Sequence, residues 1–335
     1  MSNNVTIYDV AAASGYSLAT ISRVLNHPEK VRPATREKVL KVIEELGYRP
    51  NMIARGLASR RTTTVGVIIS DITRASVAEM IGGIMDISDT YDYSIKIFSI
   101  HDDVRVKEVM KNVIAEQVDG VLYLNDELSE DSNNEIKEAL RQGNIPFVFA
   151  NVIADEKQTA SVVIDYLKAS YEMTKMLINQ GKKNIYLLST ARRYTVNVAK
   201  ENGYTKAMNE HGLEPMIFRT SGDTSINEAH FNEFFNGKEI DAAIAVRNSI
   251  AVSFLNVAIN KGYNVPNDIS LASFQNTRYA LLSRPKLTVI DIPVYDIGAV
   301  AMRLLTKLME RKAGDVGNTR IILPHSIIER QSTKH

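Results

Sequence analysis

The 335-residue sequence contains no cysteine and no tryptophan, and the first absence removes several kinds of chemistry at once. A chain without cysteine can form no disulfide, offers no thiolate nucleophile and has no sulfur ligand for zinc. No run of about 18 apolar residues occurs, so we expect no membrane-spanning helix. No charged-then-apolar leader opens the chain, which is not typical of a secreted protein. We therefore expect a cytoplasmic globular protein.

The sequence also shows no arrangement of residues typical of a catalytic site. The six histidines are scattered, and none lies at metal-ligand spacing from another: His27, His101, His211, His230, His325 and His335. The sequence has no phosphate-cradling glycine loop and no nucleophile elbow. We predict no catalytic residue, no metal and no cofactor, and hence a protein that is not an enzyme.

The net charge of +1 is unevenly distributed along the chain. Residues 1–61 hold ten Lys and Arg against five Asp and Glu, a net charge of +5 that leaves −4 for the remainder. A small basic segment on a mildly acidic body favours an anionic polymer as the partner of the first segment. The alternative is an ordinary solvated surface.

The stretch TIYDVAAASGYSLATISRVLN predicts two short helices joined by a tight turn. Thr6 can cap the first helix, Gly15 supplies the turn, and Ser17 can cap the second helix. Ile21 and Val24 then face a core. Five residues of the second helix fall on the opposite face: Leu18, Ala19, Ser22, Arg23 and Asn26.

This pattern is typical of a helix-turn-helix, in which the second helix enters the major groove of DNA. Arg23 can bond both acceptors of a guanine, a contact that contributes about 1–3 kcal/mol of discrimination. Ser17, Thr20 and Asn26 can bond phosphates, which sets the register without reading sequence. By periodicity alone, a helical hairpin with an exposed arginine fits equally well.

The segment from Thr6 to Ile69, with TREKVLKVIEELGYRPNMIARGLASRRTTTVGVII at its end, resembles the LacI/GalR family of bacterial repressors. The resemblance implies that Leu18, Ala19 and Arg23 read bases and that Asn51–Ser59 is a hinge helix that orders on operator DNA. Leu57 would wedge into the minor groove and kink the duplex. Taken alone, Leu57 could be a core leucine. The remaining DNA-binding residues implied are Thr6, Tyr8, Tyr48, Asn51, Ala54 and Arg55.

The chain beyond Arg61 alternates apolar runs with helical patterns, as parallel sheets do. The runs include TTVGVIIS, YSIKIFSI, GVLYLN, FVFAN, SVVID, NIYLLS, AAIAV, ISLASF and LTVIDIP. The fold class expected is an all-α helix-turn-helix head on an α/β core of two parallel-sheet lobes, and the resemblance implies the periplasmic-binding-protein fold. We place the head at 1–50, a hinge at 51–62 and the core at 63–335. Within the core, we expect an N-lobe of 63–160 with 286–293 and a C-lobe of 161–285 with 294–335. Crossovers are expected near 151–162 and 285–294.

The segment Val294–Met309 predicts a helix with one apolar stripe. Its other face presents Asp296, Ala299, Arg303 and Lys307. A guanidinium and an ammonium one turn apart beside a small residue suit a phosphoryl group on a partner. An ordinary solvated helix face is the alternative.

Segments such as AEQVDGVLYL, NVPNDISLASFQNTR and YDIGAVAMRLLTK are similar to the catabolite-control members of that family. This resemblance implies a corepressor, the Ser-phosphorylated form of the phosphocarrier protein HPr. Tyr295, Asp296, Arg303 and Lys307 would form the docking surface with Asp86 and Tyr91, which we expect from the other lobe. It also implies a homodimeric repressor on pseudo-palindromic, double-stranded operator DNA, associated with the nucleoid.

The cleft between the lobes is a second candidate site, with Asp71, Asn151, Lys200 and Gln275 as its residues. Where sugar-responsive members of the family place an arginine and an aspartate, this chain has Lys200 and Gln275. We therefore expect no tightly bound free-sugar inducer, while a sugar or sugar phosphate in the cleft stays the alternative signal. Members of the catabolite-control group also tend to have Met where Leu18 stands, so a diverged paralogue with a changed corepressor response is a further alternative. A solute-binding transport protein would need a signal peptide.

Overall fold

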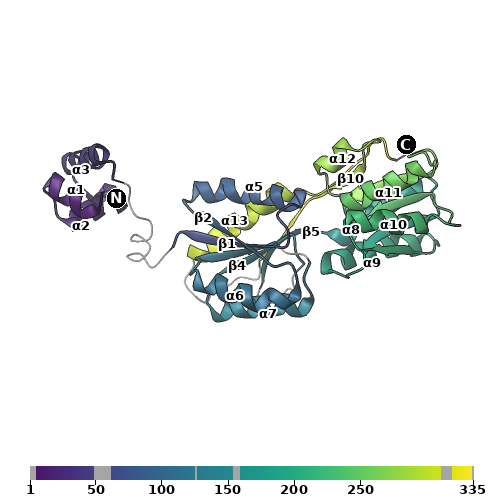
Figure 1. The fold of residues 1–335 in the computed structure, drawn as a ribbon, viewed down its shortest axis with the longest axis horizontal. Coiled ribbons are helices and arrows are strands. Elements are labelled where there is room, and N and C mark those ends of the chain that lie inside the picture. Colours follow the sequence, from purple (N-terminus) through teal and green to yellow (C-terminus); the bar gives the residue numbers. More distant parts are fainter. Residues whose placement is uncertain (1–4, 49–61, 125–126, 154–158, 311–318, 334–335) are drawn as a thin grey trace. The chain divides into compact units, whose positions relative to one another are not determined.

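A computed structural model describes residues 5–48, 62–124, 127–153, 159–310 and 319–333 (Figure 1). The chain divides into two units, Met1–Thr62 and Thr63–His335. Asn51–Ser59, predicted as a hinge helix, lies outside the described residues.

The first unit is a set of helices around a small apolar core. Its elements are α1 (Ile7–Ser14), α2 (Leu18–Asn26), the 3-10 turn η1 (Pro28–Lys30) and α3 (Pro33–Leu46). Val10, Ile21, Val24 and Val39 are buried together where the helices meet. These side chains come from three different helices, so each helix needs the other two to bury its apolar face.

The sequence signals for helix starts in this unit are confirmed. Thr6 and Asp9 form a reciprocal capping box at the start of α1. Ser17 caps α2 by accepting a hydrogen bond from the backbone N–H of Thr20 at 3.2 Å. Gly15 adopts a φ of 73°, a left-handed conformation that glycine reaches without strain and that ends α1. The turn between α1 and α2 is therefore fixed by local chemistry on both sides.

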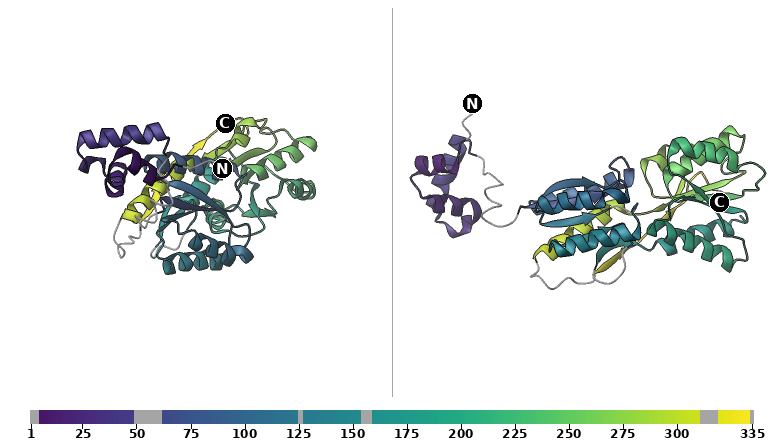
Figure 2. Two further views of the ribbon diagram at one scale, coloured as in Figure 1. Left: turned by 60° about the vertical axis from the view of Figure 1, so that its left-hand side comes forward. Right: turned by 60° about the horizontal axis from the view of Figure 1, so that its bottom comes forward.

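The second unit contains two parallel-rich sheets with helices on their faces (Figures 1 and 2). The strands are β1 (Thr64–Ile69), β2 (Ser94–Ser99), β3 (Gly120–Tyr123), β4 (Phe147–Ala150), β5 (Ala160–Ile164), β6 (Ile185–Thr190), β7 (Met216–Thr220), β8 (Ala242–Ala245), β9 (Ser270–Phe274), β10 (Thr288–Asp291), β11 (Arg320–Leu323) and β12 (Ser326–Ile328). The helices are α5 (Ala75–Thr90), η2 (Asp103–Arg105), α6 (Val106–Ala115), α7 (Glu130–Gln142), α8 (Tyr166–Asn179), α9 (Thr195–Glu210), α10 (Thr224–Phe234), α11 (Asn248–Asn260), α12 (Arg278–Leu282) and α13 (Val294–Glu310).

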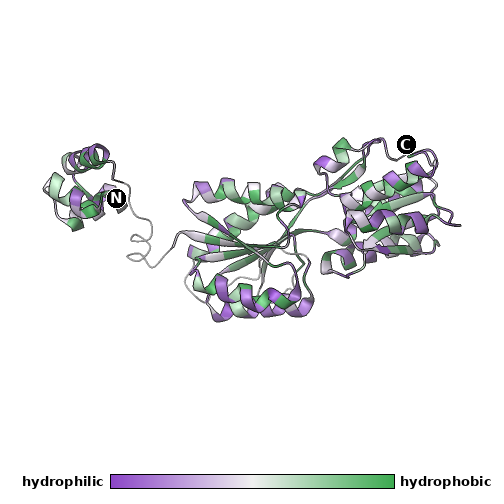
Figure 3. Cartoon of the chain, in the orientation of Figure 1, coloured by the Kyte–Doolittle hydropathy of each residue, from purple (hydrophilic) through white to green (hydrophobic). Residues whose placement is uncertain are grey.

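Strand order divides this unit into two lobes. The N-lobe sheet runs β11-β5-β4-β3-β1-β2, and the C-lobe sheet runs β12-β10-β9-β8-β6-β7. All nine predicted strand runs are strands, and their buried residues form the apolar layer seen inside each lobe in Figure 3. β7, β11 and β12 were not predicted; they are short and only partly buried edge strands, so they carry no continuous apolar run.

The expected division of the core between the lobes is wrong in three places. β5 pairs with β4 in the N-lobe, so the first crossover comes after Ile164 rather than near 151–162. β10 of the expected N-lobe segment 286–293 pairs with β9 in the C-lobe. The segment 294–335 was expected in the C-lobe, but two of its elements belong to the N-lobe. α13 packs against α5 and three N-lobe strands, and β11 pairs with β5. The chain then crosses a third time to place β12 beside β10. The apolar stripe of α13 predicts that one face of the helix is buried, but it does not identify the sheet that this face covers.

The packing of α13 on α5 brings two backbones unusually close. A Cβ built on Gly83 of α5 would lie 2.1 Å from the carbonyl oxygen of Tyr295, and one on Gly298 of α13 would lie 2.1 Å from that of Met80. Only glycine permits this approach, because a carbonyl oxygen fixed in a helix cannot move aside. These two glycines therefore set the spacing of the two helices.

We expect Gly83→Ala to destabilise the second unit by about 1–3 kcal/mol, because the added methyl overpacks the contact with α13. The neighbouring Gly82 gives a matched control, since its Cβ would meet nothing closer than 3.9 Å. Gly82→Ala should be neutral or stabilise by up to about 1 kcal/mol, the gain for replacing glycine in a helix. Chemical denaturation of the full chain measures both, and equal effects would contradict the close packing.

Candidate functional site

The exposed face of α2 carries the residues predicted to read DNA bases. Leu18 is 38% exposed, and Ala19, Ser22 and Arg23 are also exposed, whereas Ile21 and Val24 on the opposite face are buried. The helix is thus anchored on one side and presents small residues and one arginine on the other. Small side chains let a helix backbone approach a groove closely, and Arg23 is the group able to make a bidentate base contact.

The start of α2 is suited to a phosphate. The first turn of α2 contains no acidic residue, so the positive end of the helix dipole is not neutralised there. The hydroxyls of Ser17 and Thr20 lie 2.9 Å apart at this end. Ser17 accepts the cap hydrogen bond, and because the two hydroxyls share one hydrogen bond, one of their two protons is left for a phosphate oxygen.

Other residues predicted for DNA binding have varied surroundings. Tyr8 is 69% exposed, while Tyr48 packs against the core of the first unit. The Thr6 hydroxyl donates to the Asp9 carboxylate at 2.7 Å, so its proton serves the helix cap. Hydrogen bonds from the backbone and side chain of Thr6 lower the pKa of Asp9. Asn26 ends α2. The predictions for Asn51, Ala54, Arg55 and Leu57 fall outside the described residues.

The residues predicted to dock a phosphoprotein lie on α5 and α13, and the structure brings them onto one lobe. The expectation that Asp86 and Tyr91 come from the other lobe is wrong, because α13 packs on α5 within the N-lobe. The hydroxyl of Tyr295 donates a hydrogen bond to Asp86, which joins the two helices and raises the pKa of Tyr295. Tyr91, at the C-terminal cap of α5, is 45% exposed.

The basic part of this surface lies further along α13. Arg303 and Lys307 are exposed one turn apart, Asp296 is exposed, and Ala299 is half-buried against α5. Among the described residues, neither Arg303 nor Lys307 has an ion-pair or hydrogen-bond partner for its side chain. The predicted inward stripe is confirmed at Ile297 and most other positions, so the basic pair faces outward.

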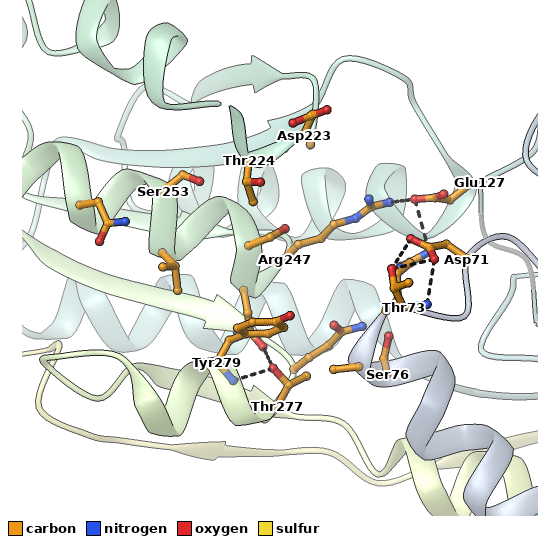
Figure 4. Close-up of a pocket in the computed structure, with 18 of the residues that line it drawn as sticks. Asp71, Thr73, Ser76, Glu127, Asp223, Thr224, Arg247, Ser253, Thr277 and Tyr279 are labelled. Atoms are coloured by element: carbon orange, nitrogen blue, oxygen red, sulfur yellow. Dashed lines mark hydrogen bonds and ion pairs between the residues drawn. The ribbon is translucent and has the colours of Figure 1, made fainter. Parts of the chain in front are cut away.

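A cleft of about 600 Å³ separates the carboxyl ends of the strands of the two lobes (Figure 4). Asp71 and Gln275, both predicted, line it. Burial raises the pKa of Asp71, but hydrogen bonds from Thr73 together with the charges of Arg74 and His101 outweigh it, and the net pKa is lowered. Side chains that the sequence did not single out line the rest, including Thr73, Arg74, Ser76, Glu127, Asp223, Arg247, Asn248, Thr277 and Tyr279.

Two predicted cleft residues are not among the residues that line the cleft. Lys200 is 3% exposed, donates to the carbonyl of Val246 at 3.1 Å and lies over the ring of Phe274 at 4.5 Å. Asn151 is also buried and accepts a hydrogen bond from the hydroxyl of Tyr166. Both side chains therefore serve packing and hydrogen bonding inside the protein.

The missed cleft residues had a weak signal. Arg247 directly follows the last buried residues of the β8 run, and Glu127 follows β3, at the strand ends where α/β proteins bind ligands. Single polar residues after strands are common, so the sequence did not distinguish these two.

The described residues hold no group of three or more His, Asp or Glu side chains placed to bind a metal. Nor is any of the helices described long and apolar enough to span a bilayer.

Comparison with known proteins gives two family matches. Residues 6–51 match the model of bacterial regulatory proteins, lacI family, and residues 174–333 match a periplasmic binding protein-like domain. Catabolite control protein A of Priestia megaterium is 42% identical over 99% of this chain and 100% of its own length. The HTH-type transcriptional regulator pepR1 of Lactobacillus delbrueckii subsp. lactis is 39% identical over 98% of each chain. These relatives are regulators, in agreement with the prediction that the chain is not an enzyme.

Solved structures agree in fold. The transcription regulator CcpA of Lactococcus lactis superimposes with a TM-score of 0.72 at 33% identity, over 82% of this chain and 100% of its own. The lac repressor dimer bound to operator and an anti-inducer has a TM-score of 0.88 at 23% identity over 99% of each chain. The predicted fold class, a helical head on a periplasmic-binding-protein-like core, is confirmed.

We expect Ser17→Ala to loosen α2, because losing an N-cap costs about 1 kcal/mol of helix stability. Amide hydrogen exchange in the peptide spanning 17–26 should speed up about fivefold in the full chain. Ser17→Asn is the matched control, since Asn caps helices as well as Ser does. Unchanged exchange in Ser17→Ala would show that the cap does not hold α2.

Proposed function

The chain is a DNA-binding transcription regulator of the lacI family of bacterial regulatory proteins, and from this premise we propose that it represses carbon-catabolite genes as a homodimer. Two heads would bind a pseudo-palindromic operator, because a two-fold symmetric protein matches a two-fold symmetric site. The observation that carries the DNA part is the face of α2, with Leu18, Ala19 and Arg23 exposed opposite a buried anchor.

In the proposed complex, α2 lies in the major groove. Arg23 donates to the two acceptors of a guanine, Leu18 and Ala19 contact base edges, and Ser17 and Thr20 donate to phosphates. The hinge residues, with Leu57 as the minor-groove wedge, are proposed to pair at the operator centre. Unstacking that step costs a few kcal/mol, which the added contact surface would offset.

We further propose that a Ser-phosphorylated HPr protein binds the α5–α13 surface and raises operator affinity. Arg303 and Lys307 are exposed, lie one turn apart and carry no competing carboxylate partner among the described residues, so both can donate to a phosphoserine. The phosphoprotein can shift the lobes only by its preference for the DNA-competent arrangement. Coupling of about 1.4 kcal/mol would correspond to tenfold tighter operator binding.

A second candidate signal is a sugar or sugar phosphate in the cleft. Its size of about 600 Å³ and its many hydroxyl, amide and charged side chains suit a polar ligand of that size. Isothermal titration distinguishes the two signals. Free sugars, sugar phosphates and the phosphoprotein are each titrated separately into the chain without DNA, and heat of binding identifies which of them the chain recognises.

The deciding experiment is fluorescence anisotropy with a palindromic operator containing a central CpG step, at two fixed salt concentrations. We expect salt-sensitive binding that tightens about tenfold when Ser-phosphorylated HPr is added. Unphosphorylated HPr is the control. Binding that ignores the phosphoprotein would leave the operator complex standing and reject the corepressor.

Within that assay, Lys307→Asp should abolish the response to the phosphoprotein while leaving basal operator affinity unchanged, because a carboxylate at that position repels the phosphoryl group. Lys111→Asp is a matched control, an exposed lysine on α6 of the same lobe. It should behave as the parent chain does. Loss of basal binding in Lys307→Asp would show that this part of α13 is structural.

A further inference from the structure

One carboxylate spans the cleft between the lobes. Oε1 of Glu127, from the loop after β3 in the N-lobe, lies 2.6 Å from Nη2 of Arg247 in the C-lobe and 3.3 Å from Nη1 of Arg74 in its own lobe. Figure 4 shows the Arg247 side chain reaching across to Glu127. The three side chains are 17–21% exposed, so solvent and salt screen this contact less than they screen a surface ion pair.

Both arginines are held in position by their own lobes. Arg247 lies with its guanidinium 5.9 Å from the ring of Tyr194, and a terminal nitrogen of Arg247 would meet a Cβ on Gly222 at 3.6 Å. Arg74 is the N-cap residue of α5 and donates to the hydroxyl of Ser70 at the end of β1 at 3.3 Å. The two guanidiniums therefore converge because of the fold.

We propose that Glu127 is a built-in anion that holds the two lobes together across the cleft, in the position where an anionic ligand would otherwise bridge Arg74 and Arg247. Two cations from different lobes around one shared anion close the cleft without any bound molecule. The chain then needs no ligand in the cleft to adopt its closed arrangement. Its signal can come from outside the cleft, a conclusion that rests on the proposed function.

The charges around this contact support the same inference. Burial raises the pKa of Asp103 in the N-lobe, but hydrogen bonds from Ser132 and Ser129, with a smaller contribution from the charge of Arg192 in the C-lobe, lower it overall. Of the charged side chains that line the cleft, the cations are Arg74 and Arg247, and both contact Glu127. The remaining charged lining residues, Asp71, Asp223 and Glu228, would repel an anion. An anionic ligand that bridges Arg74 and Arg247 must therefore displace Glu127.

The test measures the distance between the lobes in the full chain without DNA or HPr. The chain has no cysteine, so Val104→Cys and Ser221→Cys place spin labels at chosen sites on the two rims of the cleft. Both positions are exposed, Val104 beside Asp103 and Ser221 beside Gly222. Mixing with a large excess of unlabelled chain keeps one labelled pair in each dimer. Pulsed electron spin resonance then gives the distance distribution.

Glu127→Gln should shift this distribution to longer and broader distances, because it leaves two part-buried guanidiniums with no carboxylate between them. Glu116→Gln is the matched control, since Glu116 pairs with Lys96 at 2.5 Å within the N-lobe alone. It should leave the distances unchanged. An unchanged distribution in Glu127→Gln would overturn the proposal, and it would leave the operator and phosphoprotein claims untouched.

Inorganic phosphate tests whether the two arginines form an anion site. Added to Glu127→Gln at constant ionic strength, phosphate should restore the short distances, and it should fail to do so in the Glu127→Gln, Arg247→Gln double variant. In the parent chain phosphate should change nothing. Failure to restore closure in Glu127→Gln would show that Glu127 does not stand in for a ligand anion.

Discussion

The close approach of α5 and α13 is the contact on which the arrangement of the second unit depends. Gly83 and Gly298 allow each helix backbone to lie directly against the other, and no larger residue fits at either place. This contact fixes α13 in the N-lobe. The strand that precedes α13, β10, and the strand that follows β11, β12, both belong to the C-lobe. The chain must therefore cross three times between the lobes, so three segments connect them.

Much of this architecture was readable from the sequence because burial leaves a local pattern. Every apolar run became a strand, and the caps at Thr6 and Ser17 became helix starts, since those signals depend on neighbouring residues only. The lobe to which α13 belongs was not readable. Its stripe of buried residues is equally compatible with either sheet, and the glycines that decide the matter have their effect only through residues more than 200 positions away.

The candidate sites divide in the same way. The exposed face of α2 follows from one helix period, so the sequence places Leu18, Ala19 and Arg23 on it. The cleft depends on loops from two lobes, and Arg74, Glu127 and Arg247 become a group only after folding. Lys200 illustrates the opposite error. The family resemblance predicts Lys200 in the cleft, but its long side chain is buried between aromatic rings and ends on a backbone carbonyl.

The α5 helix runs between the cleft and the proposed docking surface. It begins beside Arg74, which contacts Glu127 in the cleft, and carries Asp86, bonded to Tyr295 of α13, near its other end. A helix of this length spans about 24 Å and, packed backbone to backbone, moves with α13 as one body. Any lobe movement that displaces Arg74 therefore carries the basic pair on α13 with it. A partner on that pair favours one state of the cleft when it also contacts a part of the protein that moves relative to the N-lobe, because coupling between two sites requires a different affinity for the two states.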